Sequence, residues 1–429
     1  MKIALQSWGS TGDINPFLAL AAALAAAGHK VTLAVTSTER RDYALEGQRY
    51  GFSVRQAGLI GEDVAALNRL GVRIFSEHNP LKQMALVFDE LFEPSVKPIY
   101  DAARQLADEN DLIIGHFIAH PVQLAAEQAG KPYLTVSLNH GTIATREVPP
   151  HPLPGLGYWL NSLLWRLVEW QIDRLALPSA NRLRQMTGAP LLATIKPVWQ
   201  SPLGNLIAVS RELAPIRADW GPHQMVCGFL SLPHQIEPLP QPLSDFLQAG
   251  EPPVYFTFGS MMGLPEPSRE LEQMLALLLE AVRLAGCRAI IQTHWAMADA
   301  VPDREQIFCL EAVDHRAVFP HCAAVVHHGG AGTSQSASAS GCPSIVVAHI
   351  ADQFFWGGLL HDLGIAPKMI HRHKLTARKL AHAIRQVLDD SAMRQRAKEI
   401  GARMSAEDGA LQAVAQIEAV YARLKSSAG

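Results

Sequence analysis

The sequence predicts an α/β protein in which helices cover two parallel sheets. In both halves of the chain, short apolar segments of strand length alternate with longer helical segments, a pattern typical of βαβ units. A proline-rich stretch separates the halves, and the residues after Leu375 have helical periodicity without a strand signal. Two α/β domains followed by terminal helices are therefore expected.

The alternation can be followed element by element. In the first half, apolar runs predict strands over 2–7, 30–35, 111–115 and 132–137, with a helix over 122–128. A further helix begins near Pro16, because proline suits a first helical turn, and ends at Gly28. In the second half, the predicted strands are 254–258, 288–292, 323–327 and 344–348, with helices over 267–285 and 333–340.

The domain boundary is placed where prolines recur between Leu230 and Pro253. Proline fits neither a helix interior nor a central strand, so this stretch is expected to be a linker. We predict a first domain over 1–235, a linker over 236–252, a second domain over 253–405 and a C-terminal helix over 406–429 that packs back on the first domain.

Composition excludes several classes of protein. The chain has 429 residues, 48% of them hydrophobic, and a formal net charge of −3. Nucleic acid is not an expected partner, since phosphate binding needs a clustered basic excess. Five cysteines without a CxxC pair, and a beginning without signal-peptide features, predict a reduced, cytoplasmic protein. The longest apolar run, 16–28, is shorter than the roughly 20 residues of a membrane-spanning helix.

The segment 149–177 is unusually aromatic for its place in the first domain. Trp159, Leu163, Leu167 and Trp170 share one face of a predicted helix. One interpretation is a pair of helices packed on the core. The other is the wall of a pocket for a lipophilic substrate, or a face that rests on a membrane surface.

Four loops follow predicted strands closely: 8–13, 259–260, 328–333 and 352–353. Ligands of open α/β sheets bind beyond the carboxyl ends of the strands, so these loops are expected to line one cleft. The glycines between His327 and Thr333 would let backbone amides approach an anion, with Thr333 capping a short helix. We interpret this as a diphosphate site; the alternative is a tight turn with two core histidines.

Several side chains are candidates for chemistry at these loops. His328 could donate to a departing phosphate oxygen, and Asp352 with Gln353 could bind vicinal sugar hydroxyls unless the pair is a surface turn. No Asp-x-Asp occurs, so no metal is expected to help bind the diphosphate. Asp13 is either a helix cap, a general base, or both.

These motifs resemble those of a known family. The segments 10–16, 258–260, 327–333 and 351–357 are similar to the nucleotide-sugar glycosyltransferases of GT-B fold, the superfamily of plant and bacterial UDP-glycosyltransferases. The last segment, followed by Leu375-Thr376, looks most like the sterol glucosyltransferase branch and its bacterial relatives. The resemblance implies two Rossmann-like domains facing a cleft, with the acceptor in the first domain, the donor in the second and a C-terminal helix returning to the first.

The resemblance also implies roles for individual residues. Asp13 would be the general base, paired with His116 in roles reversed from the plant histidine–aspartate pair. The acceptor site would include Trp8, His140 and Trp159. The donor site would be formed by Ser10, Gly12, Gly259, Ser260, Trp295, Val313, His328, Gly329, Gly330, Gly332, Thr333, Asp352 and Gln353.

One departure concerns the nucleotide base. Plant-type enzymes stack uracil on a tryptophan, whereas here the loop 311–315 takes that place and Ala312 cannot stack. Uridine recognition would then use backbone groups around Val313, or Trp295. UDP-glucose is favoured over a TDP-sugar on this interpretation.

The resulting hypothesis is an inverting, metal-independent hexosyltransferase without a cofactor. It would move glucose from the UDP-sugar to a hydroxyl of a lipophilic acceptor such as a sterol, terpenoid, lipid or aglycone, in the cytoplasm and peripheral to the inner face of the membrane. Two alternatives stay open. One is a nucleotide-sugar epimerase on the same scaffold, and the other is a non-catalytic protein that binds a sugar nucleotide.

Overall fold

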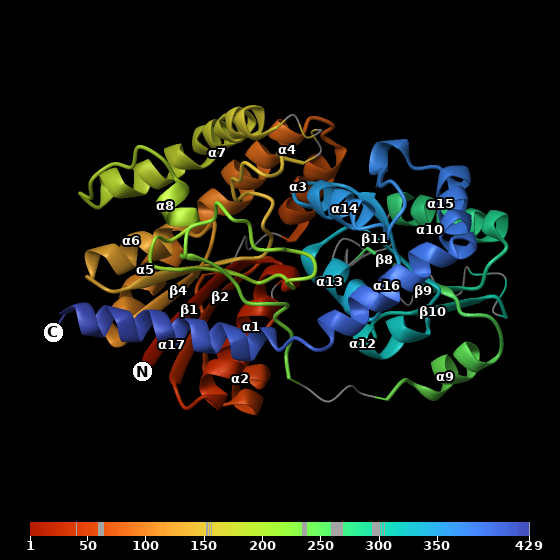
Figure 1. Cartoon of the computed structure of the whole chain (residues 1–429), viewed down its shortest axis with the longest axis horizontal. Helices are drawn as coiled ribbons and strands as arrows, with labels where there is room; N and C mark the ends of the chain where they lie inside the picture. Colours follow the sequence, from red (N-terminus) through yellow and green to blue (C-terminus); the bar gives the residue numbers. More distant parts are fainter. Residues whose placement is uncertain are drawn as a thin grey trace. The chain divides into compact units, whose positions relative to one another are not determined.

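The computed structural model describes all residues except 40, 59–63, 152, 154, 156, 234–237, 259–268, 294–300, 302, 304 and 429. The chain divides into two compact units. Unit 1 comprises Met1–Pro233 with Glu407–Gly429, and unit 2 comprises His234–Ala406 (Figure 1).

Unit 1 is built on a parallel sheet. Among the described residues, it has seven strands in the order β3-β2-β1-β4-β5-β6-β7. The strands are β1 (Lys2–Gly9), β2 (Lys30–Ser37), β3 (Ser53–Gln56), β4 (Leu112–His116), β5 (Tyr133–Ser137), β6 (Asn205–Ile207) and β7 (Gln224–Val226). Beyond their first residues β1 and β2 are buried throughout, as expected for strands covered on both faces. The strand order reverses between β1 and β4.

Helices cover both faces of this sheet. They are α1 (Thr11–Ala26), α2 (Ala44–Tyr50), α3 (Val64–Ser76), α4 (Pro80–Leu86), α5 (Val96–Glu109), α6 (His120–Gln128), α7 (Tyr158–Met186), α8 (Lys196–Trp199) and α17 (Gly409–Ala428), with a π-helix η1 (Val87–Phe92) and a 3-10 helix η2 (Glu93–Ser95). Alternate side chains of β1 enter different cores: Ile3 and Leu5 join the core with α1, whereas Ala4 joins the core with α5 and α6.

The C-terminal helix α17 completes the first of these cores. Ala413, Val414 and Ile417 are buried in the same cluster as Phe17 of α1. Figure 1 shows α17 running alongside α1. The predicted return of this helix to the first unit is confirmed.

Unit 2 repeats the same architecture. Its described strands form a parallel sheet in the order β10-β9-β8-β11-β12-β13. The strands are β8 (Val254–Thr257), β9 (Ala289–Gln292), β10 (Ile307–Leu310), β11 (Ala324–His327), β12 (Ser344–Ala348) and β13 (Ile370–His371). The helices are α9 (Gln241–Gln248), α10 (Arg269–Ala285), α12 (His315–Val318), α13 (Ala331–Ala339), α14 (Gln353–Asp362), α15 (Ala377–Asp389) and α16 (Ser391–Met404), with turns η4 (Phe319–His321) and η5 (Arg372–Lys374). The predicted α/β fold class is confirmed.

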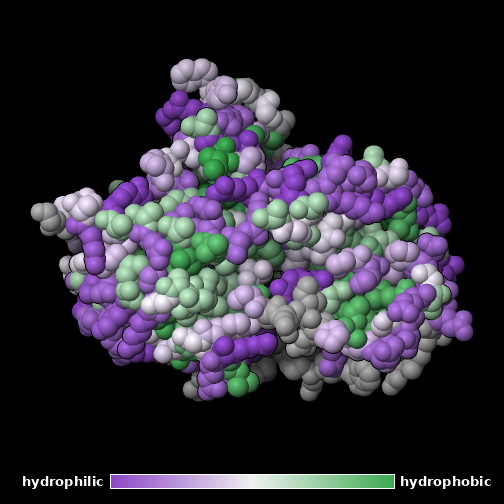
Figure 2. Space-filling view, turned by 60° about the horizontal axis from the view of Figure 1, so that its bottom comes forward, coloured by the Kyte–Doolittle hydropathy of each residue, from purple (hydrophilic) through white to green (hydrophobic). Residues whose placement is uncertain are grey.

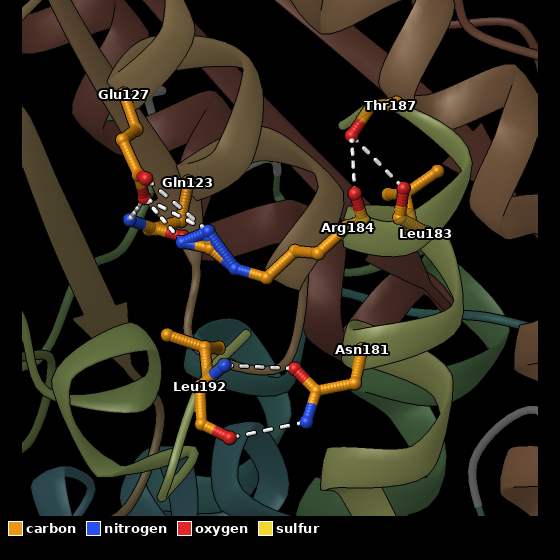
Figure 3. A network of polar contacts seen from close by, with 7 residues as sticks. All are labelled: Gln123, Glu127, Asn181, Leu183, Arg184, Thr187 and Leu192. Atoms are coloured by element: carbon orange, nitrogen blue, oxygen red, sulfur yellow. Dashed lines mark hydrogen bonds and ion pairs between the residues drawn. The ribbon is translucent and has the colours of Figure 1, made fainter. Parts of the chain in front are cut away.

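The aromatic segment forms one long helix, which corrects the expectation of a packed helical pair. The single helix α7 has 29 residues and continues through Pro178. Its C-terminal half is anchored to unit 1 through polar contacts (Figure 3). There the buried Arg184 pairs with Glu127 of α6 at 2.5 Å, and Asn181 bonds both backbone groups of Leu192.

The surface view in Figure 2 is largely hydrophilic, with hydrophobic residues in clusters between the polar ones. None of the helices in the described part of the chain has the length and apolar character needed to cross a membrane.

Candidate functional site

Two predicted site residues of unit 1, Asp13 and His116, lie where the strand order of its sheet reverses. The end of β1 carries Gly9 into α1, and the neighbouring strand β4 ends at His116. Crevices at such reversals are where open α/β sheets bind ligands. The fold therefore brings Asp13 and His116 to one place, although they are far apart in the sequence.

Asp13 is held in a defined orientation by the start of α1. Its Oδ2 accepts hydrogen bonds from the backbone N–H of Ser10 at 2.9 Å and from the Ser10 hydroxyl at 3.0 Å. A side chain at Gly9, whose φ is +131°, would collide with this carboxylate. Asp13 can therefore be both a helix cap and a general base, because Oδ2 accepts the hydrogen bonds at the start of α1 and Oδ1 accepts neither of them.

The second oxygen of Asp13 faces a buried imidazole. Oδ1 lies 3.6 Å from Nε2 of His116, whose side chain is 2% exposed, whereas that of Asp13 is 35% exposed. Neither ring nitrogen of His116 has a hydrogen-bond partner among the described residues. Phe17 and Phe117 lie against the ring. The carboxylate of Asp13 is thus partly exposed to solvent, and the buried imidazole of His116 lies next to it.

The glycine loop of unit 2 occupies the corresponding reversal in the second sheet. Strands β8 and β11 are neighbours, with His327 paired to Thr257. Gly329 has a φ of +92°, and a side chain there would collide with Val346. Gly332, by contrast, faces open space. The helix α13 begins at Ala331 with Gly330 as its N-cap, so Thr333 lies in the first turn and is not the cap that the sequence predicted.

Burial keeps the histidines around this loop neutral. His327 is fully buried, its Nδ1 accepts the N–H of Gly329 at 3.1 Å, and loss of solvation lowers its pKa to about 3. Burial, with a smaller contribution from His315, lowers the pKa of His328 to about 4. His328 can therefore act near neutral pH as a neutral hydrogen-bond donor, and not as a cation.

The turn at Asp352 and Gln353 lies against the glycine loop. Gln353 Oε1 accepts the backbone N–H groups of His349 at 2.8 Å and Ile350 at 3.1 Å, which shapes the turn after β12. The Cα of Gly329 approaches Gln353 so closely that an added Cβ would lie 3.0 Å from its carbonyl oxygen. Ala351, with a φ of 52°, marks local backbone strain of the kind found at ligand sites.

The remaining predicted residues are scattered. Trp8 is buried on β1 against Phe92, and burial lowers the pKa of the buried His140 to about 4. Trp159 is 90% exposed on α7 and is not buried in a pocket wall. Gly12 lies in the first turn of α1, and Val313 packs partly buried between β10 and α12. Gly259, Ser260 and Trp295 lie outside the described residues.

His349 is a residue that the sequence analysis missed. It follows β12 directly, is 6% exposed, and its ring lies 5.7 Å from that of Phe258. Burial lowers its pKa to about 3, and His328 contributes to this shift. Its place immediately after a strand, the same signal that marked the other loops, could have identified it.

Comparisons with known proteins cover the whole chain. Residues 285–420 match the family model of the erythromycin biosynthesis protein CIII-like, C-terminal domain. A sterol 3-beta-glucosyltransferase of Arabidopsis thaliana is 29% identical over 96% of this chain and 67% of its own length. The O-mycaminosyltylonolide 6-deoxyallosyltransferase of Streptomyces fradiae is 28% identical over 97% of both chains. The solved structure of glycosyltransferase VinC in complex with dTDP has a TM-score of 0.66 at 18% identity, over 99% of this chain and 100% of that one.

Proposed function

We propose that this chain is a glycosyltransferase of the GT-B type, like the sterol and macrolide glycosyltransferases to which it is similar, and that it glycosylates a hydroxyl of a lipophilic acceptor. The donor would be a nucleoside diphosphate hexose, with UDP-glucose favoured. The reaction would invert the anomeric centre without a metal ion.

The observation that carries the proposal is the orientation of Asp13. One carboxylate oxygen is held by Ser10, and the other, next to His116, belongs to a side chain that is 35% exposed. An acceptor hydroxyl at Oδ1 would lose its proton to Asp13 as its oxygen bonds to the anomeric carbon. The bond from that carbon to the diphosphate oxygen breaks in the same step, and its electron pair leaves with the diphosphate.

The leaving group would be stabilised by the start of α13. The first N–H groups of a helix have no acceptor within the helix and carry the positive end of its dipole. Here those groups belong to Ala331, Gly332 and Thr333, beside the loop that carries His328. A neutral His328 would add a hydrogen bond to a phosphate oxygen.

His116 is proposed as a positioning residue for Asp13. The imidazole is buried and lies 3.6 Å from the carboxylate, so it would limit the orientations that the carboxylate can adopt. The reversed pairing expected from the sequence remains a prediction.

The lipophilic acceptor is supported by two observations. Phe17 and Phe117 lie against the ring of His116, whose Nε2 is 3.6 Å from Oδ1 of Asp13, so the neighbourhood of the base is aromatic. The relatives act, by their names, on a sterol and on a tylonolide. The chain spans about two thirds of the length of the sterol glucosyltransferase, so the substrate of that enzyme is carried over here as a proposal only.

The deciding experiment compares the wild type with Asp13→Asn in a nucleotide-release assay. A panel of hydrophobic alcohols is tested with UDP-glucose and with TDP-glucose, since a structural neighbour was solved with dTDP. Asp13→Asn should lower turnover by about 10²–10⁴ while UDP binding, measured by calorimetry, is retained. An Asp13→Asn protein with wild-type turnover would refute the assignment. Sugar interconversion without acceptor-dependent release would instead indicate an epimerase, and binding without turnover a non-catalytic protein.

A further inference from the structure

The outer face of α7 exposes an apolar stripe. We define the α7 stripe as five residues whose exposed fractions are 90% for Trp159, 48% for Leu160, 52% for Leu163, 53% for Leu167 and 50% for Trp170. At 3.6 residues per turn these positions fall on one face of the helix. Single exposed apolar residues are ordinary, but a contiguous row that includes two tryptophans marks an interaction surface.

The orientation of α7 is fixed by polar contacts of residues outside the stripe. Asn161 donates to the backbone oxygen of Arg146 at 2.9 Å, and Trp165 Nε1 donates to that of Val148 at 2.9 Å. Asp173 accepts the N–H of Ile195 at 2.7 Å. Together with the Arg184–Glu127 pair drawn in Figure 3, these contacts prevent the helix from turning its stripe toward the core.

The charges on α7 are distributed unequally between its two sides. Both acidic residues are engaged away from the stripe, Glu169 with Lys196 at 2.5 Å and Asp173 with the segment at Ile195. The exposed Arg166 and Arg174 form no ion pair with any residue in the described part of the chain. Arg174 instead lies over the ring of Trp170, 4.8 Å from its centroid. The stripe is therefore apolar and aromatic, and the positively charged Arg166 and Arg174 lie beside it.

We propose that the α7 stripe docks on the surface of an anionic lipid bilayer. Leucines and tryptophans would enter the boundary between headgroups and acyl chains, while the arginines extend to lipid phosphates. A second copy of this chain fits less well, because a two-fold interface would place the same arginines together without an acidic partner on the stripe.

The proposal is tested by cosedimentation of the full chain with phosphatidylcholine vesicles that contain or lack phosphatidylglycerol. Wild-type protein should bind the anionic vesicles and bind less at high salt. A Leu163→Gln/Trp170→Gln variant and an Arg166→Glu/Arg174→Glu variant should each bind about tenfold more weakly. The control Leu411→Ser removes an apolar side chain that is 65% exposed on α17, and it should bind like the wild type.

Folding of each variant is verified by circular dichroism, which exposed positions should leave unchanged. Absence of binding to anionic vesicles, or unchanged binding of both stripe variants, would overturn the proposal. A wild-type dimer that the Leu163→Gln/Trp170→Gln variant dissociates, without vesicle binding, would assign the stripe to a second copy and overturn it as well. Vesicle binding is measured without donor or acceptor, so its outcome is independent of the transfer reaction.

Discussion

Oδ1 of Asp13 lies 3.6 Å from Nε2 of His116, at the reversal of strand order between β1 and β4. The two residues come from different βα units, so their proximity is a product of the sheet topology. Neither nitrogen of His116 has a hydrogen-bond partner among the described residues. The ion pair with Asp13 therefore suggests that this buried ring acts on the carboxylate.

His116→Ala is expected to lower kcat by about tenfold to 100-fold and to leave the KM for the donor unchanged, because His116 is not among the residues proposed to bind the donor. His116→Asn should restore part of the rate through its amide. Steady-state kinetics with both substrates varied checks this. Thr11→Ala is the control, since the Thr11 hydroxyl contacts Glu39 and not Asp13. Wild-type kcat in His116→Ala would remove His116 from the site.

Substitutions at two glycines of the loop 328–333 should affect UDP binding and stability differently. Gly332 faces open space in the first turn of α13, so Gly332→Ala should keep or raise the free energy of unfolding by up to about 1 kcal/mol. It should nevertheless weaken UDP binding, because the methyl group would occupy the proposed phosphate position. Gly329→Ala, with φ at +92° and a collision at Val346, should lower stability. Calorimetry and urea unfolding measure both effects, and unaltered UDP binding by Gly332→Ala would contradict the phosphate site.

Stability should depend on pH through the buried histidines of unit 2. Burial lowers the pKa values of His315 and His328 to about 4 and those of His327 and His349 to about 3, from an ordinary 6.5. Below pH 6.5 the unfolded chain therefore binds more protons than the folded one. The contribution of these histidines to the free energy of unfolding should be complete above about pH 6.5, and the free energy should decrease toward pH 4. Urea unfolding at a series of pH values tests this, and equal midpoints at pH 8 and pH 5 would be inconsistent with neutral buried histidines.

The first residue of α17, Gly409, should not tolerate a side chain. A Cβ at Gly409 would lie 2.5 Å from the carbonyl oxygen of Phe229 and 2.7 Å from the carbonyl carbon of Gly228. Gly409→Ala should therefore destabilise unit 1 by about 1–3 kcal/mol. Leu411→Ser, two residues later and exposed, should change stability by less than about 0.5 kcal/mol. Equal urea midpoints for the two variants would show that the backbone yields at this contact.

The sequence predicted the central strands well because burial on both faces leaves a continuous apolar run, as in β1, β2 and β12. The strands β3, β6 and β7 were missed because they lack such a long apolar run. Three of the four residues of β3 are exposed and read as polar, while β6 and β7 have only three residues each. The helical pair expected in 149–177 was wrong, because α7 is one helix that continues through the exposed Pro178.

The candidate site was predictable in part. The position of loops after strands identified 328–333 and 352–353, and the close approach of Gly329 to Gln353 brings these two together. The contact between Asp13 and His116 required the resemblance, since no local pattern joins residues on different strands. His349 was missed because a single histidine after a strand is not a motif. In the structure it is buried, and His328 contributes to the lowering of its pKa.

The return of α17 to the first core affects how the chain can fold during translation. Ala413, Val414 and Ile417 belong to the same buried cluster as Phe17, yet the ribosome makes them after all of unit 2. Residues 1–233 must therefore wait, with the apolar side of α1 uncovered, until the last helix emerges. Chaperone demand during synthesis should consequently be set by the length of unit 2, and a version of the protein with α17 moved ahead of β1 should mature faster.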